Sequence, residues 1–186
     1  MDKQTEEILQ KIEEAEYVLV GLGQEFDMEF FLQSREDYRR IREQLQQQNV
    51  LWLLPYVEEQ FRRQYLPEME AEIEKGLQKL AKVLEKKSYF VVSSSLNHKL
   101  AEVPWKKMLL KKERFVAPCG DWTKKQCPDG CEEGIQTVTE ADEEQLQESF
   151  KKLQTNGFSV PDLGKCPKCG KKLVLNNVYA LSLIHI

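Results

Sequence analysis

Four of the five cysteines in this 186-residue chain lie in two close pairs, Cys127 with Cys131 and Cys166 with Cys169. Proline and glycine within or just after each pair allow a tight turn, so both sulfurs of a pair can face one ion. Two such pairs complete the tetrahedral four-thiolate shell that Zn²⁺ favours. Because this shell leaves no position for water, the spacing predicts a structural zinc. A redox dithiol and four unrelated cysteines are the alternatives.

The composition favours a cytoplasmic protein of one domain, or of one domain with a small insert. Hydrophobic residues make up 41% and charged residues 31%, so the chain can bury a core. A net charge of −4 argues against a protein that tracks nucleic-acid phosphates. No run approaches the roughly 18 apolar residues of a membrane span. The charged, amphipathic N-terminus is unlike a secretory signal, so we expect a cytoplasmic location. The net charge and the lack of a long apolar run together lead us to expect neither nucleic acid nor a membrane as a partner.

Two short apolar runs, 17–20 and 88–93, predict parallel strands buried on both faces, and hence an α/β fold. Helical spacing of apolar residues covers 3–15, much of 24–46 and 56–87, and Pro67 is expected to divide the last of these. Strand, helical crossover and strand form a parallel-sheet unit. The first strand ends in Gly21-Leu22-Gly23, at the edge where open α/β sheets bind their ligands.

After residue 114 the long helical periodicity stops, and cysteine, glycine, proline and lysine become frequent. Residues 140–153 are the exception and predict one helix, with Thr139 as its N-cap and Asp142 three residues later. We therefore divide the chain at this point and interpret 115–180 as a small module held together by zinc.

Three motifs outside the zinc ligands are candidate functional sites. Gly21 and Gly23 form a partial dinucleotide fingerprint in which Phe26 takes the third glycine position, and a tight turn is the alternative. Acidic residues nearby, Asp27 among them, suit a helix N-terminus but would repel a phosphate. The polar run 93–98 follows the second strand, where a solvated turn is the alternative. Cys119 precedes Gly120, and the alternative is a small buried residue.

The order of these motifs resembles the sirtuins, the NAD-dependent protein deacylases, and in particular the small sirtuin-like proteins of Gram-positive bacteria. The resemblance spans most of residues 5–180. It implies that 1–114 is an incomplete, Rossmann-like NAD-binding part and that the zinc module is an insert. It further implies that NAD or ADP-ribose is bound by Gly21, Gly23, Ser95 and Asn97, and that an acyl-lysine protein is a potential substrate.

The sequence departs from the sirtuin pattern at the residues that carry the chemistry. The family's catalytic histidine falls on Cys119, its asparagine on Ser95 and its aspartate on Asn97, while His98 matches the family motif. A histidine suits the role of general base because its pKa lies near neutrality, whereas an ordinary thiol is mostly protonated there. Loss of one positioned acid or base costs roughly 10²–10⁴ in rate, so we expect deacylation to be severely impaired.

Three functions follow as hypotheses. The first is a sirtuin-like binder of NAD or ADP-ribose with a degenerate active site. The second is an active deacylase or ADP-ribosyl transferase in which His98 or Cys119 serves as the catalytic base. The third is a zinc-ribbon interaction module that binds no nucleotide.

The last six residues, 181–186, are also the translation of the first bases of a common transposase adapter used in library preparation. We therefore expect the natural sequence to depart from this one after Ala180 and to continue beyond it. His185 accordingly receives no role.

Overall fold

The computed structural model describes residues 3–27, 29–96 and 112–177, and it has an α/β fold. The larger sheet is parallel, with the strand order β1-β2-β3. Its strands are β1 (Tyr17–Leu22), β2 (Ser88–Ser93) and β3 (Phe115–Val116). The register pairs Tyr17 with Ser88 and Leu22 with Ser93, which confirms both predicted strands and their parallel direction.

The smaller sheet is antiparallel and has the strand order β5-β4-β6. It consists of β4 (Gly120–Gln126), β5 (Gln136–Thr137) and β6 (Val174–Asn177). The chain between these strands carries the four paired cysteines. The parallel sheet with its helices, together with this small sheet and its cysteine cluster, confirms the predicted fold class.

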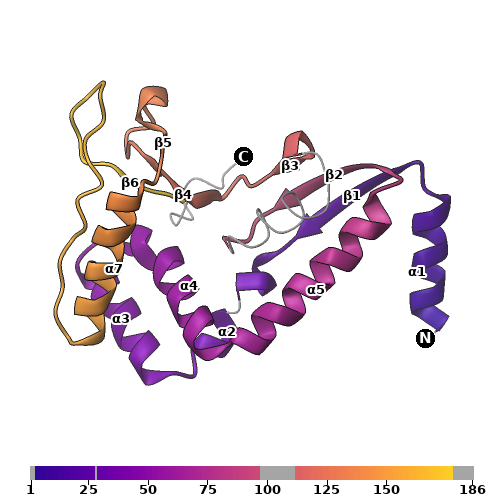
Figure 1. The fold of residues 1–186 in the computed structure, drawn as a ribbon, viewed down its shortest axis with the longest axis horizontal. Helices are drawn as coiled ribbons and strands as arrows, with labels where there is room; N and C mark the ends of the chain where they lie inside the picture. Colours follow the sequence, from indigo (N-terminus) through magenta and orange to yellow (C-terminus); the bar gives the residue numbers. More distant parts are fainter. Residues whose placement is uncertain (1–2, 28, 97–111, 178–186) are drawn as a thin grey trace.

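Helices fill most of the remaining described chain (Figure 1). The α-helices are α1 (Lys3–Glu14), α2 (Glu29–Leu32), α3 (Glu36–Gln47), α4 (Leu54–Tyr65), α5 (Pro67–Leu84) and α7 (Glu140–Gln154). Short 3₁₀ helices are η1 (Gln24–Asp27), η2 (Leu51–Leu53), η3 (Lys112–Arg114) and η4 (Glu132–Gly134). None of the helices in the described chain has the length and apolar character needed to cross a membrane.

Pro67 divides the long predicted helix into α4 and α5. A proline is tolerated in the first turn of a helix but not in its interior, so Pro67 starts α5. The predicted N-cap of α7 is also confirmed. The Thr139 hydroxyl accepts from the Asp142 N–H at 3.3 Å, and the Thr139 N–H donates to the Asp142 carboxylate at 2.8 Å. This reciprocal pair satisfies donors that a helix start leaves open.

The first of two hydrophobic cores joins α3, α4 and α7 to the small sheet. Edge-to-face aromatic pairs cross it, with ring centroids 5.4 Å apart for Tyr56 and Trp122 and 5.9 Å apart for Phe61 and Phe150. The Asn177 amide at the end of β6 donates to the Trp52 carbonyl at 2.6 Å. The helical region and the cysteine module are therefore packed as one unit.

The second core lies between α5 and one face of the parallel sheet (Figure 1). Leu77, Ala81 and Leu84 of α5 meet Tyr89 and Val91 of β2. The other face of the sheet carries apolar side chains that stay exposed among the described residues. Tyr17 is 74% and Leu19 76% exposed, and Phe90 and Val116 are each 41% exposed. Parallel sheets normally have both faces covered. The prediction that both strands are buried on both faces is therefore wrong for the described residues, since α5 covers one face and the apolar side chains of the other stay exposed.

Candidate functional site

The four paired cysteines form one compact cluster at the tip of the small sheet. Their sulfur atoms all lie within 4.8 Å of one another, and those of Cys127 and Cys169 are 3.4 Å apart. Thiolates held about 2.3 Å from a tetrahedral zinc stand roughly 3.8 Å apart, so the cluster has the size of a zinc site. All five cysteines of the chain are free thiols, and the cluster is not a pair of disulfides.

Each cysteine pair is shaped by a turn that ends in a glycine. Gly130 and Gly170 have φ values of 71° and 74°, in the left-handed region that favours glycine. Their N–H groups donate to the carbonyls of Cys127 and Cys166, at 3.0 Å and 2.9 Å. These turns explain why a glycine lies just before the second cysteine of the first pair and just after the second cysteine of the other.

Cys127 lies in a setting that favours its thiolate. Burial alone would raise its pKa, but hydrogen bonds from the backbone of Asp129 and Cys131 lower the pKa to about 7. Metal binding requires the deprotonated sulfur, so this turn prepares a ligand before the ion arrives.

Contacts between the two turns hold the cluster together. The Lys171 ammonium lies 2.7 Å from the Asp129 carboxylate, and Lys168 lies 3.4 Å from Glu133. Gly134 packs so tightly that an added Cβ would stand 2.5 Å from the Cβ of Cys127. The donor set, its dimensions and these supports fit a structural Zn²⁺, with Cys127, Cys131, Cys166 and Cys169 as its ligands.

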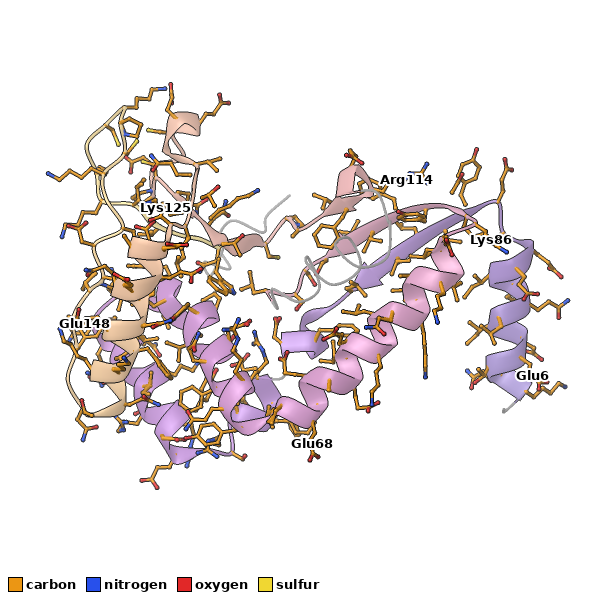
Figure 2. All side chains as sticks on the ribbon, viewed as in Figure 1. Glu6, Glu68, Lys86, Arg114, Lys125 and Glu148 are labelled. Carbon is orange, nitrogen blue, oxygen red and sulfur yellow. The ribbon has the colours of Figure 1, made fainter. Side chains whose placement is uncertain are left out.

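A buried ion pair fastens the small sheet to α7. Lys125 of β4 lies beside the start of α7 (Figure 2). Its side chain is buried, with 7% of the residue exposed, and its ammonium lies 2.7 Å from the Asp142 carboxylate. Burial alone would raise the pKa of Asp142, but hydrogen bonds from Lys125 and Thr139 lower it. Asp142 therefore both completes the capping box with the N-cap Thr139 and supplies the counter-charge of Lys125.

The second candidate site lies at the C-terminal edge of the parallel sheet, where the three strands end. The Ser94 N–H donates to the Leu22 carbonyl at 2.9 Å and so extends the pairing of β1 with β2. Beyond it, the Asp27 carboxylate accepts from the Ser95 hydroxyl and from the Leu96 N–H, the latter at 2.9 Å. The turn after β1 is thereby fixed to the turn after β2.

The two glycines of the partial fingerprint have different settings. Gly21 lies within β1, and its φ is not in the left-handed region, so the backbone does not require glycine there. A Cβ on Gly21 would meet no described atom within 4 Å, so packing does not require glycine either. Gly23 starts the turn, where its carbonyl accepts from the Phe26 N–H at 3.3 Å. Among the described residues, Gly21 therefore lies beside open space at the end of β1.

Cys119 follows β3 and is half-buried at the same edge of the sheet. Burial raises the pKa of its thiol, and the negative charge of Asp27 raises it further. Cys119 is thus a neutral thiol at physiological pH, which does not suit it to serve as a general base.

The side chain of a buried arginine in α4 contacts the turn after β1, which contains Asp27. Arg62 of α4 is 1% exposed, and its guanidinium donates to the Asp27 carbonyl at 3.2 Å. The same group lies 3.1 Å from Glu59 and 3.0 Å from Glu70 of α5. Arg62 therefore ties α4, α5 and the turn after β1 to one another.

The structure brings four of the predicted site residues to one edge of the sheet, namely Gly21, Gly23, Ser95 and Cys119. Asn97 and His98 lie outside the described residues. Sequence reasoning missed the bonds of Asp27 to the turn after β2, since the sequence predicts for it only a favourable place near a helix start and a repulsion of phosphate. The available signal was an acidic residue a few positions after a strand-glycine turn, on the same sheet edge as a serine-rich turn.

Comparison with protein-family models and with curated proteins found no match to this sequence. The sirtuin resemblance therefore stays a hypothesis that depends on the motifs alone.

Proposed function

We propose that this protein binds NAD or ADP-ribose at the C-terminal edge of its parallel sheet, and that a structural zinc holds the helical half in place. The observation that carries the proposal is the convergence of three strand ends. The glycine turn after β1, Ser95 after β2 and Cys119 after β3 meet around Asp27. Open α/β sheets bind nucleotides at this edge, in the crevice outside the carboxyl ends of their strands.

The same site favours a binding protein over an efficient deacylase. Cys119 occupies the position that a sirtuin gives to its catalytic histidine, and burial keeps this thiol neutral. Both histidines of the chain, His98 and His185, lie outside the described residues. Deacylation and ADP-ribosyl transfer are therefore secondary expectations, whereas ligand binding does not require a base.

Calorimetric titration of the zinc-loaded protein with NAD and with ADP-ribose tests this function. Gly21→Val is the informative variant, because a bulkier side chain would fill open space at the strand end without meeting a described atom at its Cβ. We expect wild type to bind at least one ligand, and the variant to lose affinity while keeping its melting temperature. Failure of wild type to bind either ligand at millimolar concentration would exclude the proposal.

The matched control substitution lies on the same strand but away from the C-terminal edge. Leu19→Val changes an exposed residue of β1 and should leave binding unaltered. A second test within the site is Ser95→Ala, which removes a donor to Asp27 and should weaken binding.

A further inference from the structure

We propose that a second copy of this chain pairs with the outer edge of β1. The two β1 strands would run antiparallel about a twofold axis at Leu19, and they would join two three-stranded sheets into one continuous sheet. The inference goes beyond the proposed function and does not depend on it, because no ligand takes part in the pairing.

Strand β1 lies at the edge of the parallel sheet, although its sequence suits an interior strand. Its only strand neighbour in the described chain is β2. The six residues of β1 include no charge and no proline, and their register with β2 runs without a bulge. Charges, prolines and bulges are the features that normally protect a sheet edge from pairing with another chain. The outer edge of β1 is therefore suited to pairing.

The main-chain groups on the outer side of β1 belong to its odd-numbered residues. Successive residues of a strand direct their N–H and C=O groups to opposite sides. The Leu22 carbonyl is on the side of β2, since it accepts from the Ser94 N–H at 2.9 Å. The groups of Tyr17, Leu19 and Gly21 consequently point outward. A partner strand centred on Leu19 would meet all three of them in hydrogen-bonded pairs.

The side chains of β1 fit the same register. On the open face, Tyr17 and Leu19 are 74% and 76% exposed. Leu19 would lie opposite the partner's Leu19, and Tyr17 opposite the partner's Gly21. A Cβ on Gly21 would meet no described atom within 4 Å, so there is room for an aromatic ring beside it, an arrangement that stabilises glycines in sheets. On the other face, the half-buried Val18 would pair with the partner's Val20.

The chain before β1 excludes a register shifted by two residues towards the N-terminus. Such a shift would use Ala15 and Glu16 as strand residues, but the Ala15 N–H still donates to the Lys11 carbonyl of α1 at 3.1 Å. The register centred on Leu19 instead uses residues 17–21, all of which belong to β1.

A second copy is the occupant that β1 itself specifies. The apolar pattern of β1 is complementary to its own antiparallel copy, and no like charges would face each other within the strand. A twofold axis makes every contact occur twice. The contact is nevertheless small, because β1 has six residues, whereas a standard interface has roughly 20–30 residues on each side. We therefore expect a dimer that dissociates in the micromolar range.

Sedimentation velocity of the full, zinc-loaded chain, from micromolar to submillimolar concentration, tests the pairing. Leu19→Pro is the most informative variant, because its N–H points away from β2. Proline there would remove a donor to the partner and leave the pairing with β2 intact. We expect wild type to dimerise and Leu19→Pro to dimerise at least ten-fold more weakly. If Leu19→Pro does not fold, Leu19→Lys replaces it, since two lysines would then face each other across the axis.

Phe90→Lys is the matched control for charge on the open face. Phe90 is 41% exposed on that face but belongs to β2, the middle strand, so this variant should dimerise like wild type. Cysteine variants test the register. Paired residues of this kind have Cα atoms about 5.5 Å apart, which suits a disulfide. Leu19→Cys should therefore form a disulfide between copies when treated with oxidised glutathione, and Phe90→Cys should not.

The outcomes separate this inference from the proposed function. A wild-type monomer at every concentration, or equal dimerisation of wild type and Leu19→Pro, overturns the pairing. An equal loss of dimer in Leu19→Lys and Phe90→Lys also overturns it, because the open faces rather than the edges would then meet. None of these results affects nucleotide binding, which is titrated separately. Gly21→Val has no place in this test, since it would alter both the ligand site and the pairing.

Discussion

The two halves of the molecule are built on different principles. The half that contains α3, α4, α7 and the small sheet has a closed core and a cluster of four thiols. In the half that contains the parallel sheet and α5, the described residues form a core on one sheet face, and Tyr17 and Leu19 on the opposite face are exposed among them. Within the described chain, the first half is therefore more completely packed than the second.

The contrast extends to the surface beside α5. An open groove of about 740 Å³ lies next to the turn after β1 and is lined mainly by apolar side chains of η1, α2 and α5. Gly76 lines it, and a Cβ there would meet no described atom within 4 Å. The glycines that pack tightly against neighbours, Gly120 and Gly134, belong to the zinc half. Gly130 and Gly170 of the zinc half resemble Gly76, however, because an added Cβ there would meet no described atom within 4 Å, so the tight packing is confined to particular positions.

Removal of zinc should have the largest effect. Structural zinc contributes roughly 10–16 kcal/mol of binding free energy in small zinc-dependent folds, and this energy is coupled to folding. Chelation, or Cys166→Ser, should therefore unfold the small sheet and loosen α7, as seen by loss of near-ultraviolet circular dichroism from Trp122. Cys119→Ser is the matched control, because Cys119 lies outside the cluster. Unchanged spectra after complete chelation would contradict a structural metal.

Substitution of the buried Arg62 should cause the second-largest loss of stability. Arg62→Met removes the cation from between the buried carboxylates of Glu59 and Glu70, and breaking such a pair typically costs about 3–5 kcal/mol. Urea unfolding measures the change. Arg63→Met is the control, since Arg63 pairs with the same Glu59 but is 57% exposed, and an exposed pair contributes less than about 1 kcal/mol. Equal effects of the two substitutions would contradict the account.

Titration of Glu58 should make the free energy of unfolding depend on pH. Burial raises its pKa to about 7, and the groups that face it are Tyr38 of α3, Asp27 of η1, Glu29 of α2 and Arg62 of its own helix. The folded state therefore holds a proton that the unfolded state releases near pH 4.5. The stability from this group is fully present below pH 4.5 and is lost as the pH rises towards 7.

Glu58→Gln should flatten this pH dependence. The change in unfolding free energy between pH 5 and pH 7 is on the order of 2 kcal/mol for wild type and should be smaller in the variant. Urea titrations across this range measure it. The variant keeps an oxygen to accept from the Tyr38 hydroxyl, which donates to Glu58 at 2.8 Å. An identical slope for both proteins would exclude Glu58 as the titrating group.

Two glycine substitutions should give the smallest effects, with opposite signs. Gly76→Ala should stabilise the protein by about 0.5–1 kcal/mol, because alanine favours the helix interior and its Cβ meets nothing at this position. Gly134→Ala should destabilise it by roughly 1–3 kcal/mol, because the new Cβ would collide with Cys127. Thermal melts of the two variants compare a loosely packed position of α5 with a tightly packed position beside the thiol cluster. The same sign for both would contradict the difference in packing.

Much of the fold could be predicted because local signals matched the tertiary structure. Apolar runs identified β1 and β2, Pro67 marked the division between α4 and α5, and Thr139 with Asp142 marked the start of α7. The cysteine spacing identified all four members of the thiol cluster. Each of these features depends on residues close together in the sequence.

Features that depend on distant residues could not be predicted. The pairing of Lys125 with Asp142, the position of Arg62 under the turn after β1 and the bond from Ser95 to Asp27 each join separate elements. Periodicity assigned Arg62 no role, because an arginine within a helix is usually solvated. The packing of α3 and α4 against the cysteine module also required the three-dimensional structure.

Hydrogen exchange measured by mass spectrometry, with zinc bound and after chelation, tests the central contrast most directly. We predict that chelation removes protection from α3, α4, α7 and the small sheet, while β1, β2 and the C-terminal half of α5 retain theirs. Loss of protection throughout the protein, or no loss within the small sheet, would contradict the division into a zinc-dependent half and a zinc-independent half.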